Sequence, residues 1–456
     1  MRMRTIYASE TGAKLDCDVY TGGGTDDTAA LQKALDTAED EGAVRLIMDG
    51  AALITGLTVY SNTTIECLND ACGFYQADNS NRAMLVNAHP SKGERIDRNI
   101  KLVGGTYNQN CLHQAHHIPP EKTYPEGDSL VVCISFFGIE NLLVRDVVIR
   151  NHRTFGFLIT NWEKVTMEDI RFELPDYICC GNQDGIHVQG PGRFLAIRNV
   201  QGKTGDDMIA LNGDEEANGE ERNWLHPHAT VGPMSDILVD TVMTDDASQV
   251  VRILSRENLI DRVTIRNISG TYRSFGFYLS AWDLRKKGFQ GDYGSIFIEN
   301  VDLRQTVPDY TYTKPFQFRI SGRHKCLTLK DIHYRDPADD RYMIWLEGVT
   351  DLKGMGIAPA QVESLVIDGL HIQDEGDTPQ TRPYILAEGK VKHMVIRNSE
   401  LYCKAGKEPV FLAASGDLAD IGRLAMYNVV AENVGTLIDD PDGRIGTLEL
   451  DSEDCE

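Results

Sequence analysis

The stretch Leu143-Val144-Arg145-Asp146-Val147 carries the pattern that decides the fold. Apolar residues come first, a polar residue and then Asp or Asn follow, and an apolar residue ends the phrase. With weaker copies at Thr241 and Gly369 included, successive copies are 23 to 42 residues apart, the length of one solenoid coil with variable loops. The other copies are Thr166–Ile170, Ala196–Val200, Thr264–Ile268, Phe297–Val301, Thr328–Ile332, Val395–Ser399 and Ala425–Val429.

A second phrase, often aromatic, alternates with the first. Two of its copies are Phe155-Gly-Phe-Leu-Ile-Thr160 and Phe275-Gly-Phe-Tyr-Leu-Ser280. Strands of a sandwich do not keep register over so many copies. Stacked coils do, because each strand pairs with its equivalent about 4.8 Å along the axis. The sequence therefore predicts an all-β fold, a right-handed parallel β-helix of about ten coils.

The recurring Asp or Asn, such as Asp146 or Asn267, is predicted to be structural. Short polar side chains at a turn satisfy backbone groups. A ladder of these residues would then mark where each coil turns, and it would take no part in a reaction.

An amphipathic helix is predicted at residues 25–41. Thr25, Asp26 and Asp27 stand where capping and acidic first-turn residues are favoured, and Gly42 stands where a C-terminal cap would be. The three glycines before Thr25 lack the Lys-Ser/Thr of a phosphate-binding loop, so a structural helix is favoured. Residues 1–60 or so would cap the solenoid and cover its open edge. No linker interrupts the pattern, so residues 1–456 are predicted to form a single domain.

The formal net charge of −24 argues against nucleic acid as a partner, because phosphates demand a basic surface. No apolar run approaches the roughly 20 residues that span a bilayer, so no membrane partner is predicted either. The N-terminus has positive charge without an apolar stretch after it. A cytoplasmic protein is the expectation, or a secreted one if a signal was trimmed. A carbohydrate is the expected partner, and the oligomeric state is left open.

Two consecutive copies of the second phrase carry carboxylates that the others lack. They read Gly181-Asn-Gln-Asp184-Gly-Ile-His187-Val188 and Thr204-Gly-Asp206-Asp207-Met-Ile-Ala-Leu211. Aligning their inward apolar residues sets Asp184 beside Asp207 on the next coil, with Asp206 one residue further out. The three carboxylates should share a patch less than about 10 Å across.

Such a cluster suits glycoside hydrolysis. Three like charges are costly to bury together, so at least one proton should be retained near neutral pH. One carboxylic acid can then protonate the leaving oxygen while a carboxylate activates water, the two groups being about 6.5–9.5 Å apart in inverting enzymes. A calcium site or a solvated turn is the other interpretation of these acids.

The two segments resemble glycoside hydrolase family 28, the polygalacturonase family. Its Asn-Thr-Asp-Gly segment is matched by Asn182-Gln-Asp184-Gly, and its Gly-Asp-Asp-Cys-Ile-Ala segment by Gly205-Asp206-Asp207-Met-Ile-Ala. The motif similarity covers roughly residues 150–270, and the coil pattern covers most of the chain. The resemblance implies that Asp206 is the general acid and that Asp184 and Asp207 hold and deprotonate the attacking water.

The resemblance also implies residues that bind the sugar. His228 stands where the family has a Gly-His-Gly segment, although the glycines are missing and His226 is a competing candidate. Asn182 and His187, within the first motif, are further substrate-binding candidates.

The family's Arg-Ile-Lys strand, which binds a sugar carboxylate, is matched by Arg252-Ile253-Leu254. Arg252 should face the substrate, but Leu254 replaces the lysine. That loses a charge-assisted contact of about 1.5–3 kcal/mol. Arg256 is a candidate replacement, and a neutral or differently linked sugar becomes an alternative to galacturonan.

Other side chains are candidates for a groove wall. Histidines at i, i+3 and i+4 in one loop have metal-ligand spacing, but no carboxylate pattern accompanies them, so no metal or other cofactor is predicted. Aromatic rings of this loop, and several tryptophans, are candidates for stacking on sugars, with core packing as the alternative. These residues are His113, His116, His117, Tyr107, Tyr124, Trp162, Trp224 and Trp282.

Three rival functions remain open. A polysaccharide lyase or epimerase on the same fold would use calcium on the aspartates and Arg252 as base. A fructan-type transferase is a further enzyme alternative. A non-catalytic carbohydrate-binding β-helix is the third, because a fold alone does not establish activity.

Overall fold

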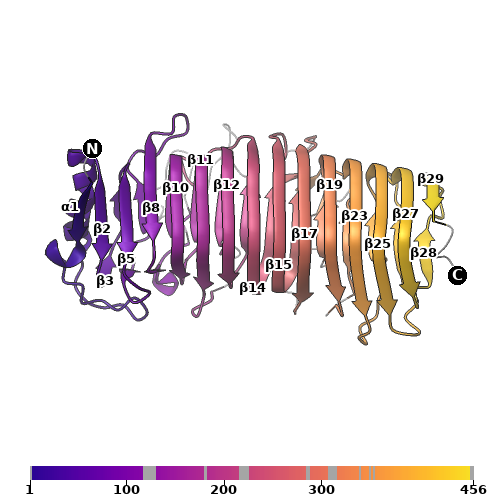
Figure 1. The fold of residues 1–456 in the computed structure, drawn as a ribbon, viewed down its shortest axis with the longest axis horizontal. Helices are drawn as coiled ribbons and strands as arrows, with labels where there is room; N and C mark the ends of the chain where they lie inside the picture. Colours follow the sequence, from indigo (N-terminus) through magenta and orange to yellow (C-terminus); the bar gives the residue numbers. More distant parts are fainter. Residues whose placement is uncertain are drawn as a thin grey trace. The chain divides into compact units, whose positions relative to one another are not determined.

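The computed structural model describes residues 3–116, 130–178, 182–214, 225–283, 288–306, 316–337, 340–348, 351–352 and 355–451. The chain divides into two compact units, Met1–Pro233 and Met234–Glu456. Each unit is built from parallel strands that pair with their equivalents one coil later (Figure 1). The prediction of a right-handed parallel β-helix is confirmed, whereas the prediction of a single domain stays a prediction. Of the helices in the described ranges, none has the length and apolar character needed to cross a bilayer.

In its described ranges, the first unit contains the helix α1 and thirteen strands. β2 pairs with β5, β5 with β8, β8 with β10, β10 with β11, and β11 with β12, all in parallel. Its elements are β1 (Arg4–Tyr7), η1 (Ala8–Glu10), α1 (Thr28–Glu41), β2 (Val44–Met48), β3 (Ala51–Ile54), β4 (Leu57–Val59), β5 (Thr63–Cys67), β6 (Gly73–Gln76), β7 (Leu85–Asn87), β8 (Asp97–Val103), β9 (Thr106–Asn108), η2 (Cys111–His113), β10 (Ile134–Arg150), β11 (Phe157–Glu173), β12 (Ile186–Gly202) and β13 (Asp207–Asn212).

The second unit is built from the same kind of coil, with sixteen strands among its described residues. A small antiparallel sheet of β16, β22 and β21 stands apart from the coils. Its elements are β14 (Met234–Leu254), β15 (Ile260–Ser280), β16 (Trp282–Asp283), β17 (Tyr293–Gln305), β18 (Phe316–Ile320), β19 (Arg323–Arg335), β20 (Tyr342–Leu346), β21 (Asp351–Leu352), β22 (Met355–Ile357), β23 (Gln361–Asp374), β24 (Ile385–Ala387), β25 (Lys390–Cys403), β26 (Val410–Ala414), β27 (Asp420–Glu432), β28 (Thr436–Asp439) and β29 (Ile445–Leu450).

The core of each unit is a stack of apolar columns, because side chains alternate along a strand and register repeats from coil to coil. In the first unit Phe157, Ile186 and Ile209 occupy equivalent positions on three successive strands, and each is fully buried. In the second unit Phe277 and Phe318 are paired and stack with ring centroids 4.7 Å apart. This regular core fixes which residues project on the other side of each strand.

The predicted structural Asp/Asn ladder is present at left-handed positions within the long strands, but its members bond to one another's side chains, not to backbone groups as predicted. Its members adopt φ angles of 50° to 60°, the left-handed region that Asn and Asp tolerate better than other side chains. The side-chain amides of Asn267 and Asn300 donate to Asp240 and Asn267, respectively, at 2.7 and 2.8 Å. The ladder residues are Asp146, Asp169, Asn199, Asn267, Asn300, Asp331, Asn398 and Asn428.

The helix α1 begins at Thr28, later than the predicted Thr25. The reason is that Asp26 and Thr25 are engaged before the helix: the Thr25 N–H donates to Asp16, and the Asp26 carboxylate accepts the Thr28 N–H. The helix ends as predicted, with Gly42 at φ 94°. Its buried stripe packs against β2 and β4 at the N-terminal end of the first unit (Figure 1).

Candidate active site

Three aspartates meet where β12 and β13 begin. Ile186 pairs with Ile209 and Val188 with Leu211, so the register continued toward the start of each strand brings Asp184 level with Asp207. Two backbone hydrogen bonds hold this segment, from Gly156 N–H to the Asp184 carbonyl at 2.9 Å and from Gly185 N–H to the Asp207 carbonyl at 2.8 Å. One carboxylate oxygen from each of Asp184, Asp206 and Asp207 lies within 4.8 Å of the others.

The cluster is almost removed from water. Asp184 and Asp207 are 1% exposed and Asp206 is 8% exposed. Three carboxylates this close repel one another strongly in a site of low dielectric constant, so a shared proton or a cation favours the assembly. The same oxygens are the ligand type that a calcium or magnesium ion prefers. The arrangement can therefore store a proton or hold a hard cation.

His187 and Asn212 lie beside Asp184. The Nδ1 atom of His187 is 2.7 Å from Asp184 Oδ2, and its Nε2 atom is 2.9 Å from Asn212 Nδ2. The imidazole is fully buried and stacks on Phe155, with ring centroids 4.1 Å apart and planes 10° from parallel. Substrate contact was the expectation for His187, whereas its described contacts are with these protein groups.

His226 and His228 share a hydrogen bond, in which the His228 N–H donates to His226 Nδ1 at 3.1 Å. His226 stacks on Phe137 at a centroid distance of 4.2 Å. Burial, helped by His228 and Lys92, lowers the pKa of His226 to about 3, so this ring is neutral under ordinary conditions. His228 is half-buried, and its carbonyl lies 3.5 Å from the Thr160 hydroxyl. Its role toward substrate stays a prediction.

The other residues predicted to bind substrate are Asn182, Arg252 and Arg256. Asn182 is half-buried and directly precedes Gln183, whose carbonyl accepts the N–H groups of Gly205 and Asp206. Arg252, half-buried, and Arg256, 8% exposed, belong to the second unit. Their part in the site stays a prediction.

Several residues predicted as groove-wall candidates pack in the core or contact other protein groups. Tyr107 and Trp162 are fully buried, and the Trp162 indole N–H donates to the Gln189 carbonyl at 3.1 Å, so core packing is the correct interpretation for both. His113 contacts Asn110 and Asp78. His117, Tyr124, Trp224 and the side chain of Trp282 lie outside the described residues.

Sequence reasoning did not identify Asn212 or Phe155 as part of the site. Asn212 is the last residue of β13 and pairs with Gln189. Both residues belong to copies of the second, often aromatic phrase, on the strands that carry or adjoin the aspartates. That position was the available signal. What a single strand does not reveal is that their side chains converge on His187.

Comparison with known proteins relates the chain to polygalacturonases. It is 24% identical over 344 residues to a polygalacturonase of Persea americana, a match that covers 71% of this chain and 66% of that protein. The matches to the polygalacturonases of two Gossypium species cover about a third of those proteins, 33% in each case. No protein-family model matches the chain.

Two solved structures share the fold. A hyperthermoactive exopolygalacturonase from Thermotoga maritima superposes with a TM-score of 0.54 at 14% identity, covering 86% of this chain and 91% of that one. A family 28 exopolygalacturonase from Yersinia enterocolitica superposes with a TM-score of 0.52 at 13% identity, covering 100% of this chain and 79% of that one. The chain is thus similar in sequence to polygalacturonases, and it shares the right-handed parallel β-helix fold of the two exopolygalacturonases.

Proposed function

We propose that the protein hydrolyses a glycosidic bond in an oligo- or polysaccharide. The observation that carries the proposal is the buried cluster of Asp184, Asp206 and Asp207, with carboxylate oxygens within 4.8 Å of one another. A scaffold gains nothing from three adjacent carboxylates, whereas acid–base hydrolysis needs a retained proton beside an ionised group. The polygalacturonase relatives support the same reaction class.

The proposed division of labour follows the family resemblance. Asp206, the most exposed of the three, donates its proton to the leaving oxygen. Asp184 and Asp207 hold a water molecule and remove its proton as it attacks the anomeric carbon. General acid–base steps of this kind contribute about 100- to 10,000-fold each.

The proposed stereochemical course is inversion. Carboxylate oxygens within 4.8 Å are closer than the roughly 6.5–9.5 Å usual for an inverting pair, so distance alone does not support this course. It is supported by the resemblance, in which two aspartates share one water. Proton NMR of the first product tests it: the released sugar should have the opposite anomeric configuration, and a retained configuration would contradict the proposal.

The proposed substrate is a carbohydrate whose cleaved sugar meets only one of the two cations that the resemblance expects for binding a carboxylate. Leu254 stands where the resemblance expects a lysine. Its apolar side chain carries no charge, and it is buried. Arg252 keeps the other cation position. Galacturonan oligosaccharides and neutral oligosaccharides therefore both belong in the substrate panel.

The decisive experiment compares Asp206→Asn with wild type on such a panel, counting new reducing ends. Asp206→Asn should lower kcat about 100- to 10,000-fold because the amide has no acidic proton to transfer to the leaving oxygen. Asp146→Asn is the matched control, since it removes one negative charge from an exposed turn of the same unit and Asn suits its φ of 59°. Turnover at the wild-type rate in Asp206→Asn would refute the assignment.

A lyase that uses a cation on the aspartates is the second candidate, because the same oxygens could hold a metal ion. A lyase would release an unsaturated sugar that absorbs in the ultraviolet and would stop in the presence of a chelator. Hydrolysis predicts no such absorbance and full activity in EDTA.

A further inference from the structure

We propose that His187 is a positioning residue that orients Asp184, with Asn212 selecting the tautomer of its imidazole. The inference rests on the proposed hydrolase function and deepens it. It gives a role to two buried polar side chains that the acid–base scheme does not use.

The hydrogen bonds define the proton positions on the ring. The side-chain NH2 of Asn212 donates to His187 Nε2 across 2.9 Å. An acceptor at Nε2 leaves the proton of the neutral ring on Nδ1. That proton is donated to Asp184 Oδ2, 2.7 Å away, so this oxygen acts as an acceptor. Asp184 is then held as the ionised member of the cluster, and the retained proton falls to the pair Asp206 and Asp207.

The ring has little freedom to turn. His187 lies in β12 between Leu158 of β11 and Ala210 of β13, and the backbone pairs on both sides fix its position. Phe155 stacks on its face and belongs to an apolar cluster with Leu158 and Phe137. A side chain fixed in this way transmits its orientation to the carboxylate it binds.

Two other roles fit the environment less well. Direct contact with sugar requires an accessible ring, and His187 is fully buried. Simple core packing would be served by an apolar side chain, such as the leucine and alanine at the equivalent positions of the flanking strands. A buried imidazole with a polar group at each nitrogen is the more costly choice, and orientation of Asp184 explains it.

Three substitutions separate these roles by steady-state kinetics. His187→Asn places an amide near the Nδ1 position and should keep most of kcat. His187→Gln places its amide near the Nε2 position, toward Asn212, and loses the contact with Asp184. His187→Phe keeps only the stacking on Phe155. Both should lower kcat about 100-fold, because the reacting carboxylate is misplaced. KM should not change in any variant, because the residue does not touch the sugar. A purely structural role predicts the reverse order, with Phe the most active; wild-type kcat in His187→Phe, or equal losses in Asn and Phe, would overturn the proposal.

The hydrogen bond can also be observed without turnover. NMR spectra of protein labelled with ¹⁵N-histidine show the imidazole signals. Those of His187 are assigned as the signals that are absent from the spectrum of His187→Asn. They should report the neutral tautomer with its proton on Nδ1, and Asp184→Asn should shift that proton. A proton on Nε2 would overturn the positioning role even if sugars are hydrolysed. The Nδ1 tautomer in a protein that hydrolyses no sugar of the panel would instead refute the hydrolase proposal and leave the positioning contact intact.

Discussion

At the scale of single residues, close packing decides what a side chain can do. Trp162 has the chemistry of a sugar platform, but the coil encloses it: its indole N–H is satisfied by a backbone carbonyl and its ring covers Gly192. A Cβ atom at Gly192 would lie 2.1 Å from the Trp162 ring. A glycine within a strand often marks such a close approach.

Gly192→Ala should therefore destabilise the protein. The ring or the strand must shift to admit the methyl group, and overpacking of this kind costs about 1–3 kcal/mol. Urea unfolding measures the change in the free energy of unfolding. Gly93→Ala is the control, because a Cβ there meets nothing within 4 Å. Equal stability of the two variants would mean that Trp162 is not packed in this way.

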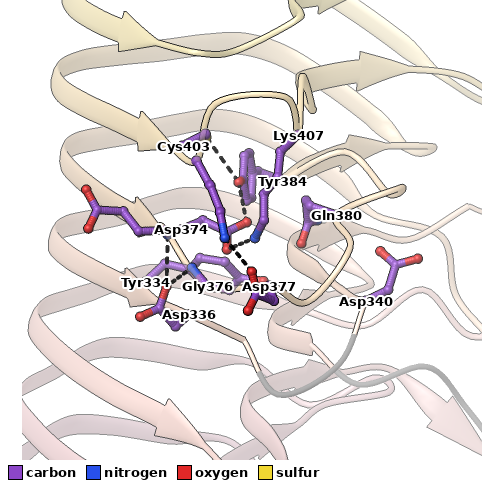
Figure 2. Close-up of polar contacts among 12 residues, drawn as sticks. Tyr334, Asp336, Asp340, Asp374, Gly376, Asp377, Gln380, Tyr384, Cys403 and Lys407 are labelled. Atoms are coloured by element: carbon purple, nitrogen blue, oxygen red, sulfur yellow. Dashed lines mark hydrogen bonds and ion pairs between the residues drawn. The ribbon is translucent and has the colours of Figure 1, made fainter.

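At the scale of elements, a buried ion pair between Lys407 and Asp374 joins the loop after β25 to the end of β23 in the second unit. Figure 2 shows Lys407 and Tyr384 converging on Asp374, the last residue of β23. The Tyr384 hydroxyl donates to Asp374 at 2.8 Å and lies 3.3 Å from the thiol of Cys403, the last residue of β25. The Asp374 side chain is fully buried and that of Lys407 is 9% exposed. The contacts tie the loop after β25 to the end of β23.

Lys407→Met should destabilise the second unit by about 3–5 kcal/mol, because it leaves the buried Asp374 carboxylate without its neutralising charge. Thermal or urea unfolding gives the measurement. Lys404→Met makes a matched comparison three residues earlier: its partner Asp377 has a side chain 94% exposed, so solvent already screens that pair and stability should hardly change. A similar loss of unfolding free energy in both variants would argue against a stabilising role for the buried Lys407–Asp374 pair.

At the scale of the whole molecule, buried histidines make stability depend on pH. Burial lowers the pKa of His152 and His324 to about 4 and that of His226 to about 3. In the unfolded chain these groups titrate near pH 6.5. Below that pH the unfolded state binds protons that the folded state does not, so stability should fall as pH decreases from about 6.5 toward 4.

Each of the three rings should remove about 1.4 kcal/mol of unfolding free energy per pH unit in this window. Urea unfolding at pH 7.5, 6.5 and 5.5 tests the slope. His324→Gln keeps a donor for the Ser321 carbonyl but cannot take up a proton, so the slope should fall by one histidine's share. His393→Gln, at an exposed position, should leave the slope as it is. An unchanged slope in His324→Gln would contradict the prediction.

Local repetition let the sequence alone determine much of this protein. The sequence alone predicted the period of the coils, the structural Asp/Asn ladder, the C-terminal cap at Gly42 and the register that sets Asp184 level with Asp207. The helix cap depends on the residues beside it in the chain, and the other features depend on alternation along a strand or on the equivalence of successive coils. All of these patterns can be read from the sequence alone.

Only the tertiary structure decided what surrounds those positions. The burial of Trp162 and the contact of His187 with Asn212 depend on which side chains of adjacent coils meet. The later start of α1 depends on a hydrogen bond that the segment before the helix makes with Asp16. A side chain's exposure and hydrogen-bond partners are properties of three-dimensional packing, and residues far apart in the chain contribute to them. The strand pattern places each residue on a face of the coil, and the neighbouring coils determine what that residue can contact there.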